Sequence, residues 1–323
     1  MARYAARRLL LLVPVILSAA VVTFALLLLL PGDPALALLG QEASEVELAR
    51  FRHLLGLDRP VLVQLGLYLW RVAHADFGRS ITLDTPVLRL ISSTLPATLE
   101  LATASLFLAV LAGIPLGLLA ARRRGTPVDT GTMLLAQLGV SMPVFWLGVL
   151  LILLFAVKLN WLPSFGRGEP LLSALVTGDT AVAADSLRHL ILPTFTLAFF
   201  NLALLSRLTR WAMLEVLEED YVRTARAKGQ RERLVLYRHA LRNALLPIVT
   251  IVGLQFGNAL GGAVVTETIY GWPGMGRLVV QAIGQRDFPV VQGAVLVLAL
   301  LFSLFNLLVD LTYAIIDPRI RYE

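Results

Sequence analysis

The sequence predicts an all-α membrane protein with six transmembrane helices, and three observations support this fold class. Of its 323 residues, 57% are hydrophobic and 15% are charged, against about 25% charged in ordinary soluble proteins. The mean hydropathy is +0.77. Apolar runs long enough to cross a hydrocarbon core of about 30 Å recur along the chain. This composition excludes a disordered chain and a coiled coil, and the absence of cysteine excludes a disulfide scaffold.

Six apolar runs alternate with polar segments that Pro and Gly interrupt. Each run is predicted to be one span, because about 20 helical residues cross the bilayer core. The runs are residues 9–30, 97–121, 131–157, 190–206, 244–266 and 290–316, of which the fourth is the shortest. The first run follows a basic start, as a signal peptide does. It is longer than the usual hydrophobic region of about 7–15 residues, so an uncleaved span is expected.

The distribution of Lys and Arg predicts the orientation of these spans. With the N-terminus inside, the inner segments 1–8, 122–130, 207–243 and 317–323 hold most of the 28 basic residues. In the outer segments, basic and acidic residues nearly balance. Both ends are therefore expected in the cytoplasm. The predicted domains are residues 1–30 with the first span, an extracytoplasmic helical subdomain at 31–96, a core transmembrane domain at 97–316 containing a cytoplasmic loop at 207–243, and a cytoplasmic tail at 317–323.

The outer segment after the first span begins with the turn sequence Pro-Gly-Asp-Pro at 31–34. Apolar spacing then predicts two amphipathic helices, at residues 42–57 and 60–75. Two interpretations stay open for this subdomain. It is either a solvated segment lying on the membrane or a docking platform or lid over a pore.

The loop at 207–243 is the longest inner segment. Three acidic residues at 218–220 precede a predicted short helix at 221–228, which Lys228 and Gly229 end. Tyr221, Ala225 and Gly229 recur every four residues and share one face, where two small residues would let another surface approach closely. The alternative interpretation is an ordinary basic loop.

Several kinds of chemistry leave no trace in the sequence. It has no nucleotide-binding loop of the G-x-x-x-x-G-K-[ST] type, no H-E-x-x-H zinc motif and no cysteine nucleophile. If energy is consumed, another chain must supply it. We expect no catalytic residue, no metal, no cofactor bound by this chain and no nucleic-acid partner.

The loop resembles the coupling loop of ABC importer permeases. The general pattern is E-A-A, three residues, G, and then I-x-L-P. It is matched here by Arg223-Thr224-Ala225, Gly229 and the Leu-Pro at 246–247, with Arg223 and Thr224 departing from it. The whole string D-Y-V-R-T-A-R-A-K-G at 220–229 is instead the familiar form of the peptide branch of this family.

Further strings extend the resemblance along nearly the whole chain, to the first permease subunit of dipeptide, oligopeptide and nickel ABC importers. They are P-G-D-P at 31–34, L-G-L-D-R-P at 55–60, D-F-G at 76–78, P-A-T-L-E-L at 96–101, S-M-P at 141–143, T-E-T-I at 266–269, W-P-G at 272–274, D-F-P at 287–289, N-L-L-V-D at 306–310 and D-P-R at 317–319. Each string alone is weak, but ten of them in order are very specific.

The resemblance implies a type I ABC importer permease fold with a peripheral first span, in the cytoplasmic membrane of a bacterium or archaeon. It implies a second homologous permease, two cytoplasmic ATPases that hold ATP and Mg, and an extracytoplasmic solute-binding protein. The substrate would be di- or oligopeptides, with nickel chelates, glutathione or another small solute as alternatives. The residues expected to couple to an ATPase are Asp220, Tyr221, Arg223, Thr224, Ala225, Arg226, Lys228 and Gly229.

Polar side chains inside spans are costly and usually face protein or water. Asn201, Gln255 and Asn258 are therefore the candidates for lining a translocation path, and the last two share a helix face. Asn306 and Asp310 are expected to form an interhelical hydrogen bond. Glu100, near the outer interface, is expected to have a structural role or to contact the outer subdomain.

Outer residues are candidates for contact with a binding protein or for a gate. They are Asp33, Trp272 and Pro273. The alternative for Trp272 is an interfacial tryptophan anchor.

Two other function classes compete with the importer. A self-sufficient secondary transporter or channel would need intramembrane acids or bases, and only Glu100 and Asp310 are available. An intramembrane enzyme lacks a catalytic constellation.

Overall fold

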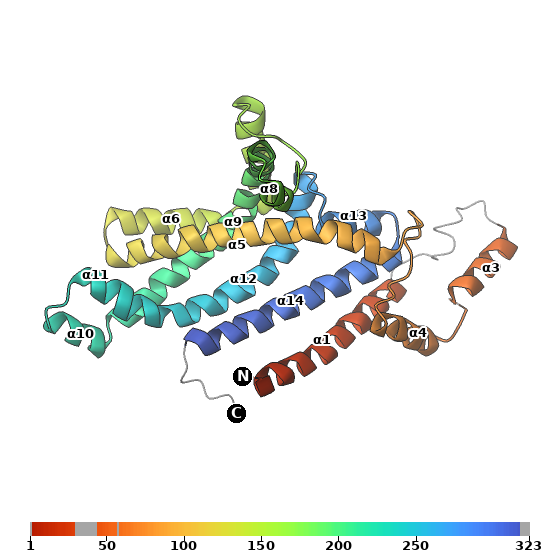
Figure 1. Ribbon diagram of the computed structural model, residues 1–323, viewed down its shortest axis with the longest axis horizontal. Helices are drawn as coiled ribbons and strands as arrows, with labels where there is room; N and C mark the ends of the chain where they lie inside the picture. Colours follow the sequence, from red (N-terminus) through yellow and green to blue (C-terminus); the bar gives the residue numbers. More distant parts are fainter. Residues whose placement is uncertain (1, 30–43, 57, 317–323) are drawn as a thin grey trace. The chain divides into compact units, whose positions relative to one another are not determined.

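The computed structural model describes residues 2–29, 44–56 and 58–316. Helices dominate this part of the chain, and its only β-pairing is an isolated bridge between Arg79 and Pro86. Figure 1 shows the helices α1 (Ala2–Leu29), α3 (Glu45–Leu55), α4 (Val61–Ala73), α5 (Val87–Arg122), α6 (Pro127–Ser141), α7 (Val144–Leu151), α8 (Leu171–Thr177), α9 (Thr180–Leu217), α10 (Asp220–Ala227), α11 (Glu232–Leu234), α12 (Arg242–Ile269), α13 (Met275–Gly284) and α14 (Phe288–Ile316). Two π-helices, η1 (Ile152–Lys158) and η2 (Val235–Leu241), continue α7 and precede α12.

Four described helices are long and apolar enough to cross a membrane. They are α5, α9, α12 and α14, and they contain the predicted second, fourth, fifth and sixth runs. The fourth run underestimates its helix, because α9 extends well beyond residues 190–206 at both ends. In α1, the described apolar stretch is Leu10–Ala25. The chain is thus an all-helical protein with several membrane-length helices.

The third predicted run, residues 131–157, is not one continuous helix. It divides into α6 and the α7–η1 pair, which meet at an angle of 105°. Met142 between them is extended, with φ −84° and ψ 124°. Pro143 explains the break, since proline has no N–H to donate and disfavours helical geometry in the preceding residue. Among the residues that the structure describes, this bent pair counts as a fifth candidate span if it crosses the membrane as one unit.

The chain divides into two compact units. The first contains the described residues of Met1–Pro96 together with Gly274–Leu304. Its core is formed by Val87, Ile91, Met275, Ala282, Val290 and Ala294. A Cβ added at Gly293 on α14 would lie 2.7 Å from Val87 Cγ1, so glycine is required for this packing.

In the first unit, the two predicted outer helices are α3 and α4, each shorter than predicted by a few residues. Ser44 and Glu47 form a capping box at the start of α3, and Gly56 ends the helix with φ +68°. A buried carboxylate, Asp287, accepts a hydrogen bond of 2.9 Å from the Thr82 hydroxyl. This contact ties the segment before α5 to the start of α14.

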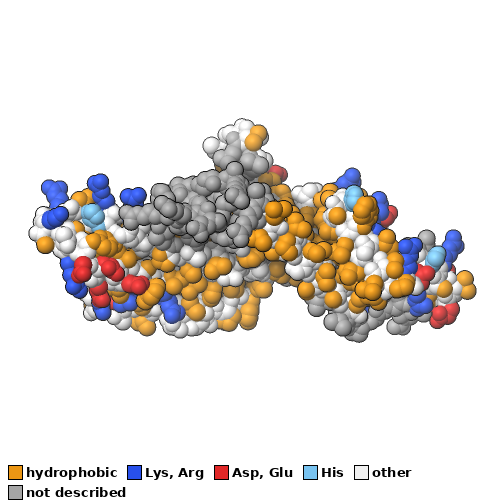
Figure 2. All heavy atoms as spheres, turned by 90° about the horizontal axis from the view of Figure 1, so that it is seen from below, with side chains coloured by type: hydrophobic (Ala, Val, Ile, Leu, Met, Phe, Trp, Pro, Cys, Tyr) orange, Lys and Arg blue, Asp and Glu red, His pale blue; other side chains and the backbone are white. Residues whose placement is uncertain are grey.

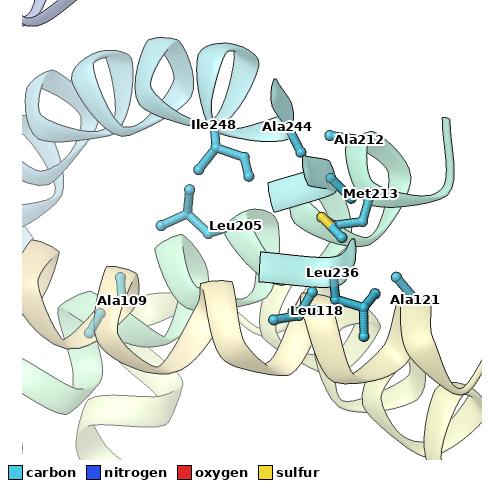
Figure 3. Close-up of a cluster of buried hydrophobic side chains, with 11 residues drawn as sticks. Ala109, Leu118, Ala121, Leu205, Ala212, Met213, Leu236, Ala244 and Ile248 are labelled. Carbon is cyan, nitrogen blue, oxygen red and sulfur yellow. The ribbon is translucent and has the colours of Figure 1, made fainter. Parts of the chain in front are cut away.

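The second unit contains Ala97–Pro273 and the described residues of Phe305–Glu323. Here α9 packs against α6 and α12 (Figure 1). The principal cluster of buried apolar side chains, drawn in Figure 3, joins α5, α9, η2 and α12 and includes Leu118, Leu205, Met213, Leu236 and Ile248. Close approach of α5 to α9 depends on Gly117, where a Cβ would collide with the carbonyl oxygen of Ser206.

Candidate functional site

The segment 207–243, predicted as a loop, is largely helical. Its first part continues α9 to Leu217. The predicted short helix at 221–228 is present as α10, Asp220–Ala227. Gly229 follows with φ +71°, a left-handed conformation that glycine adopts without steric cost. The η2 and α12 helices then lead the chain back into the apolar core.

The inner side of α10 packs against its own chain. Val222 is fully buried and Ala225 is 7% exposed, and both contact the buried Val235 of η2. The end of α9 closes this small cluster with Val216 and Leu217. The predicted docking face shared by Tyr221, Ala225 and Gly229 is therefore wrong at its centre. Ala225 is the contact through which α10 rests on its own chain, and it is not open to a partner.

The outer side of α10 is polar and exposed. The exposed residues of the predicted coupling set are Asp220, Tyr221, Arg223, Thr224, Arg226, Lys228 and Gly229. Arg226 is paired with Glu232 of α11 at 2.9 Å. Hydrogen bonding to this guanidinium lowers the pKa of Glu232 below its ordinary value, and the same contact raises the pKa of Arg226. Arg223 pairs more loosely with Asp220, at 3.3 Å.

Two polar contacts tie α10 and the residues after it to the helices behind. Asn243, at the start of α12, donates a hydrogen bond of 2.7 Å from Nδ2 to the Tyr221 hydroxyl. Gln230 Oε1 and His239 Nε2 of η2 are also 2.7 Å apart. Together with the cluster of Val222, Ala225 and Val235, these contacts fix the buried side of α10 and leave its opposite side exposed.

The three amides predicted to line a path are brought together, but they are not equally accessible. Gln255 donates a hydrogen bond of 2.6 Å to Asn201 Oδ1, and Asn258 donates one of 2.7 Å to Gln255 Oε1. Asn201 and Gln255 are each 2% exposed, whereas Asn258 is exposed. The structure places Asn201 and Gln255 in the contact between α9 and α12, so neither lines a path in this arrangement.

Trp272, predicted to contact a binding protein or to form a gate, is fully buried. Its indole N–H donates a hydrogen bond of 2.9 Å to the carbonyl oxygen of Ala97, which lies inside α5. A side chain without exposed surface cannot contact a partner directly, so the predicted contact with a binding protein is wrong for Trp272. The alternative that Trp272 belongs to a gate stays a prediction. Its neighbour Pro273 is exposed. An interfacial anchor is also excluded for Trp272, because such an anchor requires contact with lipid.

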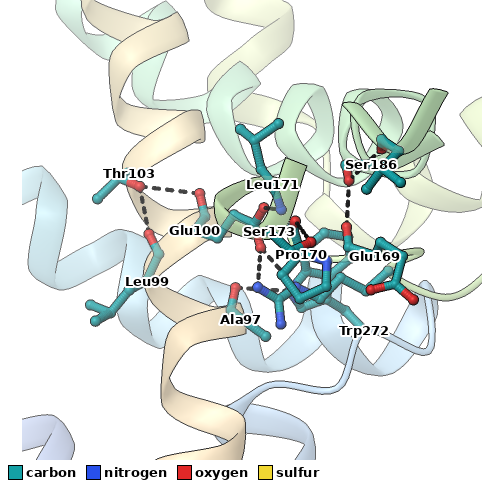
Figure 4. A network of polar contacts seen from close by, with 12 residues as sticks. Ala97, Leu99, Glu100, Thr103, Glu169, Pro170, Leu171, Ser173, Ser186 and Trp272 are labelled. Carbon is teal, nitrogen blue, oxygen red and sulfur yellow. Dashed lines mark hydrogen bonds and ion pairs between the residues drawn. The ribbon is translucent and has the colours of Figure 1, made fainter. Parts of the chain in front are cut away.

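Trp272 belongs to a polar network that Figure 4 shows around one turn of α5. Arg167 Nε donates a hydrogen bond of 2.7 Å to Glu100, and its guanidinium lies 5.9 Å from the centre of the Trp272 ring. The backbone N–H of Leu171 donates to the other Glu100 oxygen at 3.1 Å. Glu100 thus has the structural role expected of it, and it holds the segment before α8 against α5.

Sequence reasoning missed two buried polar residues near this network. Glu267 is fully buried and accepts a hydrogen bond of 2.6 Å from Thr98. The Tyr270 hydroxyl lies 2.9 Å from that of Thr196, and burial raises the pKa of Tyr270 to about 12. An acid directly after an apolar run was a usable signal for Glu267. No local pattern distinguishes Tyr270 from an exposed tyrosine.

Two predicted positions fall outside what the structure describes. Asp33, a candidate for binding-protein contact, lies outside the described residues, as does the side chain of Asp310. The expected hydrogen bond between Asn306 and Asp310 stays a prediction.

The chain resembles known transport proteins over its whole length. Residues 113–322 match the family model described as binding-protein-dependent transport system inner membrane component, and residues 1–102 match the model of its N-terminal region. The dipeptide transport system permease protein DppB of Alkalihalophilus pseudofirmus is 44% identical over 333 residues, with all of both chains covered. Over the full length of both chains, the Pseudomonas aeruginosa di/tripeptide permease protein DppB is 43% identical and the Escherichia coli dipeptide permease protein DppB is 42% identical.

A solved structure shares the fold at low sequence identity. It is an inward-facing form of the MetNI methionine ABC transporter, matched with a TM-score of 0.56 and 17% identity, over 71% of this chain and 97% of that one. This comparison concerns the fold alone, whereas the family models and the full-length relatives concern ancestry. The chain therefore belongs to the family of inner membrane components of binding-protein-dependent transport systems.

Proposed function

We propose that this chain is a permease subunit of an ATP-driven importer of di- and oligopeptides. The observation that carries the proposal is full-length identity of 42–44% to relatives named as dipeptide or di/tripeptide transport permeases. The substrate is assigned by that similarity. The alternatives of nickel chelates, glutathione or another small solute are separate outcomes of the test below.

We place six crossings in the cytoplasmic membrane of the cell. They are α1, α5, the bent α6–α7–η1 pair, α9, α12 and α14, with both chain ends in the cytoplasm. The concentration of Lys and Arg in the inner segments supports this orientation. In this topology residues 31–96 are extracytoplasmic and residues 97–316 form the core, with α10 on the cytoplasmic side.

The partners follow from the family. A second homologous permease completes the pathway, two cytoplasmic ATPases bind ATP and Mg, and an extracytoplasmic binding protein delivers the substrate. This chain holds no cofactor and performs no bond chemistry. Its α10 helix seats on one ATPase, where Tyr221, Arg223, Thr224 and Lys228 offer an exposed contact surface.

The contacts behind α10 explain how movement of the ATPase would reach the membrane. Val222 and Ala225 join α10 to η2, and the Tyr221–Asn243 hydrogen bond joins it to α12. A displacement of α10 is therefore carried into α12 with little loss, because each contact is buried or directional. Such a displacement would open the pathway alternately to each side by rocking of the helix bundle.

Along α12 the pathway candidate is Asn258. It is exposed, and its amide is oriented by Gln255, which in turn is fixed by Asn201. Pro273 is the remaining described candidate for contact with the binding protein.

The test is co-purification followed by reconstitution. The tagged chain is extracted gently from native membranes, and its partners are identified by mass spectrometry. We expect a second permease and ATPase subunits, and the reconstituted complex with its binding protein should import labelled dipeptides only when ATP is supplied. Import of nickel chelates or glutathione instead would overturn the peptide assignment. Solute transport by the isolated chain would overturn the importer assignment.

A further inference from the structure

Helix α4 is apolar on the face that it turns away from the rest of its unit. An ordinary surface helix carries polar residues there. Helical spacing places six residues on this outward face, all exposed and none polar: Leu62, Val63, Gly66, Leu67, Trp70 and Ala73. Leu62 is 80% exposed and Trp70 is 67% exposed. We refer to these six residues as the α4 outer face.

The opposite face of α4 is held by α1. The Tyr68 ring stacks on Phe24 with 5.7 Å between ring centres, and the Tyr68 hydroxyl lies 3.5 Å from that of Thr23. Leu65, Leu69 and Val72 on the same side of α4 are half-buried. Because this side is already covered, the α4 outer face is the surface left for a partner.

The exposed surface of α1 is apolar in the same way. Val13, Leu17 and Val22 are between 49% and 62% exposed. Under the proposed function, α1 is the first membrane span and these side chains contact lipid. Helix α4 contacts α1 at Thr23 and Phe24, so the α4 outer face lies beside that end of the proposed span. Figure 2 shows hydrophobic side chains gathered over the region of α1 and α4.

The length of α4 restricts how it can meet the bilayer. Its 13 residues give about 20 Å at 1.5 Å per residue, which is short of the hydrocarbon core of about 30 Å. It therefore cannot cross the membrane. Its polar groups lie at the edge of the outer face, where the Trp70 and His74 rings are 4.3 Å apart and Arg71 is exposed. An apolar face bordered by a tryptophan and a basic residue is typical of a helix at the membrane interface.

Helix α3 provides a contrast within the same unit. Its exposed residues include Glu45, Glu47 and Arg50, so it is suited to water. A binding protein that leaves after each delivery would return the α4 outer face to water at every cycle. At about 25 cal/mol per Å² of apolar surface, repeated exposure of four large apolar side chains is unfavourable. Lipid acyl chains, unlike a binding protein, would cover the α4 outer face throughout the transport cycle. They also need no hydrogen-bonding group on that face.

From these observations we infer that α4 lies in the outer interface of the bilayer, with lipid acyl chains covering its outer face. The inference rests on the proposed function in placing α1 as a span and residues 31–96 on the outer side. It makes α4 a membrane anchor of the extracytoplasmic subdomain rather than a docking platform or a lid over the pore.

This chain has no cysteine, so with cysteine-free partner subunits a label can be confined to one introduced position. Single variants Val63→Cys, Leu67→Cys and Trp70→Cys are spin-labelled in the complete transporter, reconstituted in lipid nanodiscs. Accessibility is measured to oxygen, which enters lipid, and to a water-soluble nickel chelate. Ala49→Cys on α3 is the aqueous control, and Leu17→Cys on α1 reports independently on the span assigned by the proposed function.

We expect high oxygen and low nickel accessibility at all three α4 positions, and the reverse at position 49. High nickel accessibility on α4 would overturn the inference in favour of a solvated helix. Low accessibility to both reagents would overturn it in favour of coverage by protein. If position 17 is in lipid while α4 is not, the inference fails and the proposed span stands. If position 17 is in water, the proposed topology itself fails.

Discussion

Gln255 on α12 donates a hydrogen bond from Nε2 to Oδ1 of Asn201 on α9 across 2.6 Å, and both side chains are 2% exposed. A buried amide pair of this kind fixes the register of the two helices, because any sliding would leave polar groups without partners. The pair also orients Asn258, the one member of the group that is exposed. The proposed pathway residue Asn258 therefore lies within one turn of the buried pair on α12.

Breaking this pair should destabilise the protein. Gln255→Leu leaves Oδ1 of Asn201 buried without its donor, and we expect a loss of about 1–2 kcal/mol, measured by unfolding of the purified chain in detergent. The matched control is the double variant Asn201→Leu with Gln255→Leu, in which neither polar group remains. The double variant should recover most of the loss. A double variant less stable than the sum of the two single ones would contradict the pairing.

Asn258 should behave in the opposite way. Because its side chain is exposed, Asn258→Ala should change the free energy of unfolding by less than about 0.5 kcal/mol. If Asn258 lines the pathway, uptake by the reconstituted transporter should nevertheless change, with a shift in the substrate concentration for half-maximal rate. Unchanged uptake kinetics would remove Asn258 from the pathway.

The sequence predicted most of the helices, because apolar runs and the positions of Pro and Gly are local signals. The break after α6 was not predicted, because residues 131–157 were expected to form one span. Pro143 was the local signal for it, since proline disfavours helical geometry at Met142, which is extended. The short helix α10 was predicted within one residue of its bounds for the same reason: Gly229 has positive φ and ends it.

Burial was not predictable in the same way. Ala225 and Trp272 were both expected on an exposed surface. Instead, Ala225 packs against Val235, and the Trp272 indole donates a hydrogen bond to the Ala97 carbonyl. Ala97 is distant from Trp272 in the sequence, and Val235 meets Ala225 only after η2 has packed against α10. A pattern can therefore say that a residue is special without saying whether it faces a partner or its own chain.

Gly229 gives a test of coupling that separates backbone strain from bulk. A Cβ there would meet nothing within 4 Å, so the folded chain has room for a side chain, but φ +71° strains any L-residue by about 1–2 kcal/mol. Gly229→Leu should leave the complex assembled while ATP hydrolysis continues and peptide uptake falls. Gly229→Ala carries the same strain without the bulk and should retain most of the uptake. Equal losses in both variants would assign the effect to strain alone.

The Arg226–Glu232 pair predicts a pH dependence of α10. Pairing lowers the pKa of Glu232 below its ordinary 4.5, so the stabilisation is complete above about pH 4.5 and is lost as the pH falls through the lowered pKa. Both side chains are about half exposed, and the pair is worth about 0.5 kcal/mol. Glu232→Gln at pH 7 should speed amide exchange in residues 220–232 about twofold. Arg223→Gln, which removes the looser pair, should have a smaller effect, and equal effects would contradict this ranking.

The adjacent residues Trp272 and Pro273 separate a structural role from a contact with the binding protein. Trp272→Phe removes a buried hydrogen bond to Ala97 and leaves a small void, so we expect a loss of about 1–3 kcal/mol in the free energy of unfolding. Pro273 is exposed, so Pro273→Ala should change stability little. If Pro273 contacts the binding protein, its replacement should weaken binding of that protein to the reconstituted permease, measured by titration. Weakened binding in a Trp272→Phe variant of unchanged stability would return Trp272 to the contact surface, which its complete burial opposes.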